Sequence, residues 1–200
     1  MNSRATTRST NTRERALKQG RESFRTQAWG AAFSQLSAAN GEVPLEADDL
    51  VLLAQAALLI GREADGSDFL ARAHQAFMER GNTQIAARCA FWLGFTLLLS
   101  GESSKAGGWL SRASRLLEGE PDCVEKGYLL LPTGYRAVRS GDTATAQVAF
   151  EQATAVGERF GDKDLETLGL QGQGRTLIRQ GEITQGVGLL DDAIVGLRVV

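Results

Sequence analysis

Glycine recurs at intervals of about twenty residues along this 200-residue chain, and this period limits the fold more than any other feature. The recurring glycines are at positions 20, 41, 61, 81, 101, 141, 161 and 181, and Gly119 with Pro121 stands near the missing position. A helix commonly ends at a residue in the left-handed conformation, which glycine adopts without a steric penalty. The residues that follow, as in "RGNTQIA", "SGESSKA" and "SGDTATA", suit the start of a next helix. Each block is therefore predicted to be one helix and a tight turn.

Between these glycines the apolar residues have helical spacing. Leu110, Ala113, Leu116 and Leu117 fall on one side of a helix, and no block alternates with the period of a strand. The longest apolar run covers residues 91–99. It is too short for a membrane-spanning helix, which needs about 20 apolar residues. The sequence predicts an all-α fold without a membrane span.

Pairs of blocks form a unit of about forty residues, which predicts repeats over residues 41–80, 81–120, 121–160 and 161–200. Superposed on their turn glycines, the four units share small residues before and after the turn, then a large apolar residue, then alanine. These sets are Ala54, Gly94, Gly134 and Gly174; Gly66, Ala106, Ala146 and Gly186; Leu70, Leu110, Phe150 and Leu190; and Ala73, Ala113, Ala153 and Ala193. Residues 12–40 are predicted to form a leading helix of one array over 12–200, and residues 1–11 a disordered basic leader.

This pattern resembles the tetratricopeptide (TPR) repeat, most closely in "FWLGF" and "GWLSRA". In that family small residues let the first (A) and second (B) helix of a repeat approach closely, and the large residue fills the groove between them. The period departs from the family, since it is about forty residues instead of the usual 34. The resemblance implies a right-handed α-solenoid of TPR-like helix-turn-helix repeats.

A narrower resemblance is to the N-terminal helical region of large bacterial LuxR-type transcriptional regulators. The stretches that carry it are "GRESFRTQAWGAAFSQLSAA", "DFLARAHQAF", "RCAFWLGFTLLLSGE", "GWLSRASRLLE" and "AVGERFGDKDLETLGLQGQGRTLIRQGE". In that family the array precedes a helix-turn-helix domain. Since the chain stops at Val200 inside a predicted helix, we expect a truncated product or a fragment without its DNA-binding domain.

Charge is unevenly placed along the chain, whose formal net charge is −2. Residues 1–25 carry seven Lys/Arg and two Glu, an excess of five positive charges, so the remainder carries −7. This acidic balance disfavours nucleic acid as the main partner, although direct binding by the Arg-rich leader stays an alternative. Two cysteines in apolar surroundings and the absence of a signal peptide predict a cytoplasmic protein.

Residues for catalysis or metal binding are sparse. His74 is the only histidine, and "GLQGQG" at 169–174 follows no strand and precedes no Lys-Ser/Thr, so it fits helix packing better than phosphate binding. The acidic pairs Asp48–Asp49 and Asp191–Asp192 are expected on solvated helix faces. The sequence predicts no enzyme, no cofactor and no metal; an enzyme of unrecognised type stays the opposing hypothesis.

A concave face lined by A helices is the predicted binding site, since ligands of TPR arrays lie there. The register places on it Asp48, Gln55, Arg88, Phe91, Phe95, Tyr128, Leu131, Tyr135, Gln171, Arg175 and Arg179. Such a face suits a protein or extended peptide with apolar anchors and acidic groups, or an amphipathic small effector. Alternatively, the aromatic residues pack against the preceding B helix. Pro132 is expected to kink its helix within this face.

The sequence therefore predicts a non-catalytic interaction or regulatory module, the sensory part of a LuxR-type regulator. Two alternatives stay open. One is a nucleic-acid-associated protein that uses the basic leader. The other is a homodimerisation scaffold, because "DDAIVGLRVV" in the last repeat has an apolar face that a second copy would cover.

Overall fold

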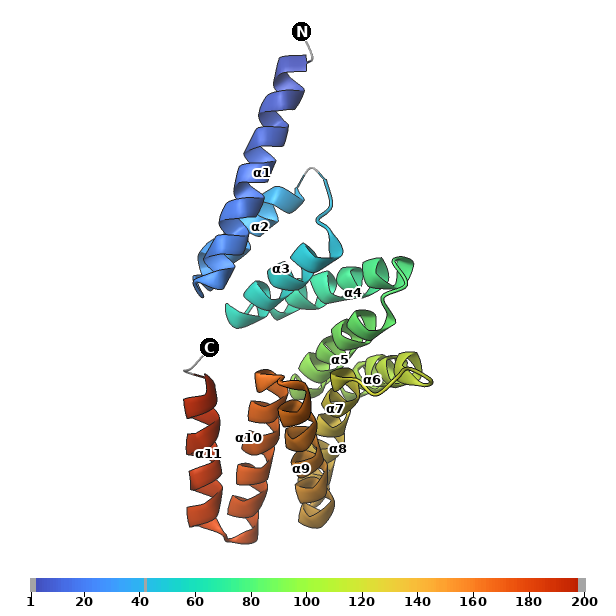
Figure 1. Cartoon of the computed structure of the whole chain (residues 1–200), viewed down its shortest axis with the longest axis vertical. Coiled ribbons are helices and arrows are strands. Elements are labelled where there is room, and N and C mark those ends of the chain that lie inside the picture. Colours follow the sequence, from blue (N-terminus) through green and yellow to red (C-terminus); the bar gives the residue numbers. More distant parts are fainter. Residues whose placement is uncertain (1–2, 42, 198–200) are drawn as a thin grey trace. The chain divides into compact units, whose positions relative to one another are not determined.

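A computed structural model describes residues 3–41 and 43–197 of the chain, and all regular structure among them is α-helical. The helices are α1 (Ser3–Arg25), α2 (Trp29–Asn40), α3 (Ala47–Leu59), α4 (Glu63–Glu79), α5 (Thr83–Leu99), α6 (Ser103–Leu117), α7 (Val124–Tyr128), α8 (Leu130–Ser140), α9 (Thr143–Phe160), α10 (Lys163–Gln180) and α11 (Ile183–Leu197). The prediction of an all-α fold is confirmed (Figure 1).

The turn glycines have the predicted conformation. Their φ angles lie between 69° and 93°, in the left-handed region, for Gly61, Gly81, Gly101, Gly119, Gly141, Gly161 and Gly181. The residue after the turn caps the next helix in three cases: the side chains of Asn82, Asp142 and Asp162 accept hydrogen bonds from the backbone N–H three residues ahead. The twenty-residue period is therefore the period of helix termination.

The N-terminal part differs from the expectation. Gly20 lies inside α1, where a Cβ would be 2.7 Å from Leu36 Cγ, and Gly41 has an ordinary helical φ of −68°. The chain turns instead at Gln27, a non-glycine residue with φ 58°, so the expected leading helix over 12–40 is two helices, α1 and α2. Residues 3–11, assigned from the sequence to a disordered leader, continue α1; residues 1 and 2 lie outside the described part.

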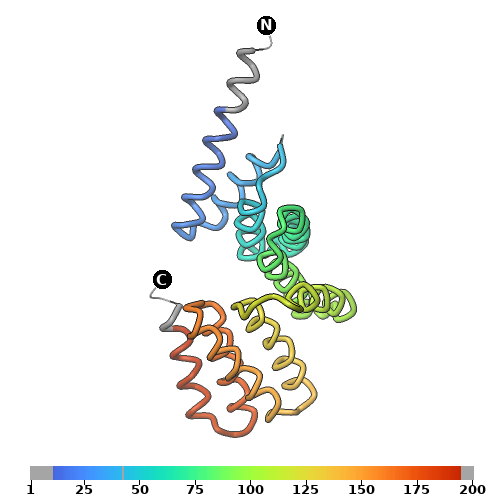
Figure 2. Tube along the Cα trace, turned by 45° about the vertical axis from the view of Figure 1, so that its right-hand side comes forward, coloured from blue at the N-terminus to red at the C-terminus, as the bar shows by residue number. Residues whose placement is uncertain are grey.

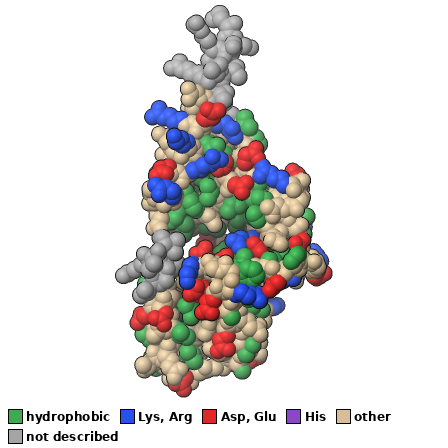
Figure 3. All heavy atoms as spheres, viewed as in Figure 1, with side chains coloured by type: hydrophobic (Ala, Val, Ile, Leu, Met, Phe, Trp, Pro, Cys, Tyr) green, Lys and Arg blue, Asp and Glu red, His purple; other side chains and the backbone are tan. Residues whose placement is uncertain are grey.

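The chain divides into two compact units, Met1–Trp109 and Leu110–Val200, where the sequence predicted one array over 12–200. In the first unit, consecutive helices from α1 to α5 pack side by side; in the second, α8, α9, α10 and α11 do so (Figures 1 and 2). Side chains of both charges are interspersed on the viewed face of each unit (Figure 3).

Phe150 of α9 is the centre of packing in the second unit. It is fully buried, and two glycines of A helices lie against its ring. A Cβ on Gly134 of α8 would be 2.6 Å from Phe150 Cζ, and one on Gly172 of α10 would be 2.2 Å from Cδ1. One large B-helix residue thus fills the space that small residues of its own and the next A helix leave open. The predicted pairing of small and large residues is confirmed here.

Pro132 causes an interruption of the third repeat's A helix. Because proline cannot donate to the carbonyl four residues earlier, the helix breaks at Leu129 between α7 and α8, and Pro132 lies in the first turn of α8. Tyr128, at the end of α7, donates a 2.8 Å hydrogen bond to Asp162 Oδ1, the same atom that caps α10. The expected effect of Pro132 is therefore seen as an interruption of the helix at Leu129. The Tyr128 hydrogen bond connects the end of α7 to the start of α10 in the next repeat.

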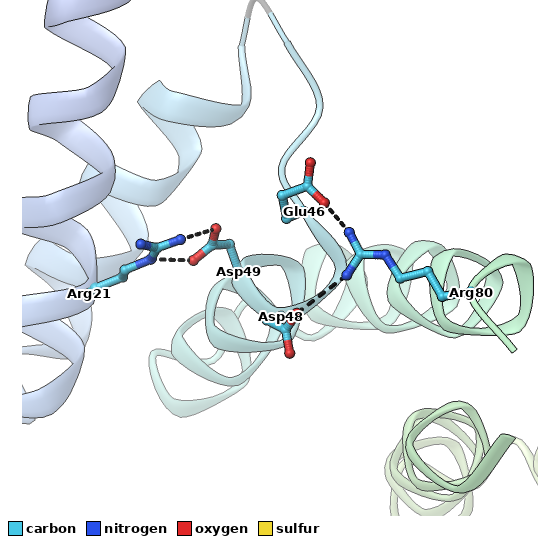
Figure 4. Close-up of polar contacts among 5 residues, drawn as sticks. All are labelled: Arg21, Glu46, Asp48, Asp49 and Arg80. Carbon is cyan, nitrogen blue, oxygen red and sulfur yellow. Dashed lines mark hydrogen bonds and ion pairs between the residues drawn. The ribbon is translucent and has the colours of Figure 1, made fainter. Parts of the chain in front are cut away.

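Ion pairs hold α1 and α4 to α3 in the first unit (Figure 4). Arg21 donates to both carboxylate oxygens of Asp49, at 2.6 and 2.7 Å, and the Asp49 side chain is only 2% exposed. Arg80, at the end of α4, contacts Glu46 and Asp48, the latter at 3.4 Å. The hydrogen bond to Asp49 raises the pKa of Arg21, so the guanidinium stays charged. Asp48, which was expected on a binding face, thus takes part in a structural ion pair with Arg80.

We predict that Arg21→Ala lowers the free energy of unfolding by about 2 to 3 kcal/mol, because it leaves the buried Asp49 carboxylate without its partner. Chemical denaturation measures the change. The matched control is Arg25→Ala, which removes an exposed pair with Glu22 and should leave stability unchanged. Equal losses in the two variants would contradict the assignment.

We predict that Gly134→Ala destabilises the protein by about 1 to 3 kcal/mol, because the new methyl group overlaps the Phe150 ring. Gly188→Ala in α11 is the control, since a Cβ there meets no atom within 4 Å. The control should stabilise the chain by up to about 1 kcal/mol through higher helix propensity. Thermal unfolding of both variants decides, and a stabilising Gly134→Ala would contradict the packing described.

Candidate functional site

The aromatic and apolar residues expected on the binding face are buried. Their exposed fractions are 1% for Phe91, 4% for Phe95, 2% for Tyr128 and 0% for Leu131. Phe91 and Phe95 stack at 5.3 Å between ring centroids and pack against Trp92. The expectation that these four side chains line an open face is wrong. Their helical spacing puts them on one side of their helices, and in the structure that side is packed between helices.

The other predicted residues lie in different units. Arg88, half-buried on α5, and Gln55, exposed on α3, belong to the first unit. Tyr135 on α8, and Gln171, Arg175 and Arg179 on α10, belong to the second. The structure brings together only this second group, because α8 and α10 are neighbouring A helices.

Arg175 and Arg179 face α8 from successive turns of α10. The Arg179 guanidinium donates to the Val138 carbonyl at 3.4 Å. The positive charge of Arg175 acts on the phenol of Tyr135, whose ring packs edge-on against Phe150 at 5.2 Å. Burial raises the pKa of Tyr135, and Arg175 partly offsets that rise. Tyr135 is half-buried, whereas both arginines are exposed.

Arg139 is a residue of this surface that the sequence analysis missed. It follows Val138 in the last turn of α8, one helical turn after Tyr135, and is exposed. Its position four residues after Tyr135 was the available signal. We define the basic face as Tyr135, Arg139, Gln171, Arg175 and Arg179. Among the residues that the structure describes, no carboxylate forms an ion pair with its three arginines. The basic face therefore presents cations that are free to meet an acidic group.

The residues that were considered for a chemical role serve the packing of the helices instead. His74 is buried, with Nδ1 at 2.9 Å from the Ala86 carbonyl oxygen. Burial raises the pKa of Cys89 to about 12, so its thiol stays protonated. In "GLQGQG", Gly169 and Gly172 pack against α9, and Gly174 against α11, which confirms the packing interpretation. Within residues 3–41 and 43–197, no three His, Cys, Asp or Glu side chains gather as metal ligands would.

Three of the N-terminal arginines bond to groups of the chain itself. Arg13 donates to the backbone carbonyls of Ala39 and Pro44 at 3.2 and 3.3 Å, Arg21 to Asp49, and Arg25 to Glu22. Arg15 and Lys18 are exposed. These bonds reduce the positive charge that α1 offers to a phosphate backbone.

Among the described helices, none combines the length and apolarity required to cross a bilayer.

No protein-family model matches the chain, and no curated protein matches it in sequence. Solved structures do match. MamA has a TM-score of 0.55 at 16% identity, covering 94% of this chain and 92% of MamA. A kinesin light chain with nearly identical TPR-like repeats from Podosopora anserina has 0.56 at 12%, covering 92% and 93%. BtubC (BKLC) from P. vanneervenii has 0.52 at 16%, covering 96% and 91%. Similarity at this identity establishes the fold: the chain has a TPR-like helical repeat fold.

We predict that the Tyr135 phenol ionises above its ordinary pKa of about 10, because burial disfavours the phenolate. Tyrosinate absorbance reports it in a Tyr128→Phe background, since the chain has only two tyrosines. Arg175→Met should raise the pKa further. Because the folded pKa is raised, the contribution of Tyr135 to stability is complete below the unfolded pKa and is lost as pH rises through the folded pKa. An unchanged titration in Arg175→Met would place Arg175 away from Tyr135.

Proposed function

We propose that this protein is a non-catalytic, TPR-like interaction module that binds an extended acidic segment of a partner protein or peptide along the basic face. The observation that carries the proposal is the cluster of three exposed arginines, without carboxylate partners among the described residues, beside a half-buried tyrosine on two adjacent A helices. An arginine guanidinium can donate two parallel hydrogen bonds to a carboxylate, and a partly exposed aromatic ring offers an apolar anchor.

The regulatory context is a finer proposal. We propose that the module is the sensory part of a LuxR-type transcription regulator and acts in the cytoplasm, where an acidic segment or a small acidic effector would be its signal. Support for the regulator comes from the sequence stretches that resemble that family, and for the location from two free, buried cysteines. Nucleic-acid binding has less support, because three arginines of α1 bond within the chain. Homodimerisation concerns another surface, the apolar side of α11.

Fluorescence anisotropy with labelled twelve-residue peptides tests the basic face. The acidic probe alternates Glu with Leu and Tyr, and its counterpart has Lys in place of Glu. We expect binding of the acidic probe only, weakened by salt. Arg175→Glu and Arg179→Glu should each weaken it by about fivefold or more, which corresponds to about 1 kcal/mol per lost charge pair.

The matched control is Arg115→Glu, since Arg115 is also an exposed arginine in the last turn of its helix. It changes the net charge equally and should leave the affinity within about twofold, as expected for a surface charge outside the basic face. An equal loss in the control, or no binding of the acidic probe, would refute the proposed site. Tighter binding of a single-stranded DNA oligonucleotide, lost in Arg15→Gln/Lys18→Gln, would favour the nucleic-acid alternative.

A further inference from the structure

The outer side of α11 carries an apolar stripe that no other described helix of its own unit covers. Ile183, Val187 and Ile194 are 61%, 45% and 52% exposed. With the half-buried Leu190 they follow one another at helical spacing, so they lie on one side of α11. Ile178 of α10, 36% exposed, lies beside them against Gly186. We name these five residues the open face; α11 stands at the edge of its unit in the ribbon of Figure 1 and in the tube of Figure 2.

The repeat itself shows what covers these positions elsewhere. Forty residues before the open face stand Val138, Thr143, Gln147, Phe150 and Thr154. Helix α10 packs against α9 and contacts Val138, Phe150 and Thr154 of this set. Arg179 donates to the Val138 carbonyl, and Gly172 lies against Phe150. Gly169 meets Thr154, which also accepts a 2.7 Å hydrogen bond from Gln173.

The first unit repeats this arrangement. Glu63, Leu70 and His74 of α4 are the counterparts of Ile183, Leu190 and Ile194, and α5 covers them. His74 bonds to the Ala86 carbonyl, Leu70 packs with Leu93, and Ser100, which follows α5, donates to Glu63 at 3.1 Å. In both units, therefore, the side of a B helix that corresponds to the open face receives the A helix that follows.

We propose that the open face docks an amphipathic helix of a partner protein, which takes the place of a following A helix. The inner interfaces define its chemistry. It presents Gly or Ala where Gly169 and Gly172 meet α9, so that the backbones approach closely. It places a basic residue in its last turn. In α10 the equivalent residue is Arg179, which donates to the Val138 carbonyl. On the open face the Ile178 carbonyl would accept the corresponding hydrogen bond. The exposed carboxylates of Glu182 and Asp191 lie beside the stripe and favour a basic rim on the partner.

A second copy of the chain fits this face less well. Its α11 would bring Ile and Val where α10 brings Gly169 and Gly172 to α9, so the helices could not approach as closely. Its α1 is polar on the corresponding outer side, where Arg15, Lys18 and Gln19 are exposed. The stripe is also only about 18 Å long, at 1.5 Å per helical residue, which is short for a stable dimer interface of roughly 800 Å² per partner.

The α10 sequence is the natural probe, because α10 covers the equivalent positions on α9. A fluorescein-labelled peptide with the sequence of residues 163–180 is held helical by a staple replacing Thr167 and Gln171, on the side away from Gly169. We expect it to bind the full 200-residue chain. Val187→Asp and Ile194→Asp should each weaken binding by about tenfold or more, because a charge is then buried against apolar side chains.

Three controls make the result specific. Val148→Asp on α9 alters an equally exposed apolar residue (52%) outside the open face and should not change the affinity. A peptide with Leu in place of Gly169 and Gly172 should fail to bind, since close approach is lost. Arg175→Glu/Arg179→Glu in the chain should leave this binding intact, which separates it from the basic face.

The proposal is overturned if the stapled peptide does not bind, if the Leu-substituted peptide binds equally well, or if Val148→Asp weakens binding as much as Val187→Asp. Sedimentation velocity of the full chain covers the remaining case. A dimer that Ile194→Asp dissociates and that the peptide does not displace would assign the open face to a second copy.

Discussion

The close approach of A and B helices at small residues is the interaction on which the rest of the structure depends. Phe150 shows it most clearly, because its ring occupies space that exists only while Gly134 and Gly172 lack side chains. One residue thereby joins three helices and two successive repeats. Such a contact fixes both the spacing and the orientation of the helices. The forty-residue period of the sequence therefore becomes a spatial repeat of helix pairs, and the surface residues take their positions from it.

Charge is then arranged differently in the two units. In the first unit, Arg21 and Arg80 form ion pairs that hold α1 and α4 to α3. In the second, Arg139, Arg175 and Arg179 project from A helices without a carboxylate partner in the described chain, beside Tyr135. A buried, paired charge adds to the definition of the fold, whereas an exposed, unpaired cluster is available for recognition. The functional proposal follows from this contrast.

Much of the fold could be predicted from the sequence because its determinants are local. A glycine in the left-handed conformation ends a helix at each turn from Gly61 to Gly181. After Gly81, Gly141 and Gly161 the next residue also caps the helix that follows. The first hairpin was missed because its turn is at Gln27, a residue type that seldom adopts a positive φ. The candidate site was predicted only in part. Helical spacing does not distinguish a residue between two helices, such as Phe91, from one on their open side, such as Arg175.

Native-state hydrogen–deuterium exchange of the full chain tests most directly the claim that each helix is held by its neighbours and that α11 has an uncovered side. Helix α10 packs against α8, α9 and α11, whereas among the described helices α11 packs mainly against α10. Amides in the middle of α10 should therefore exchange at least about tenfold more slowly than those in the middle of α11. Equal protection of the two helices would show that the outer side of α11 is already covered in solution and would contradict the account.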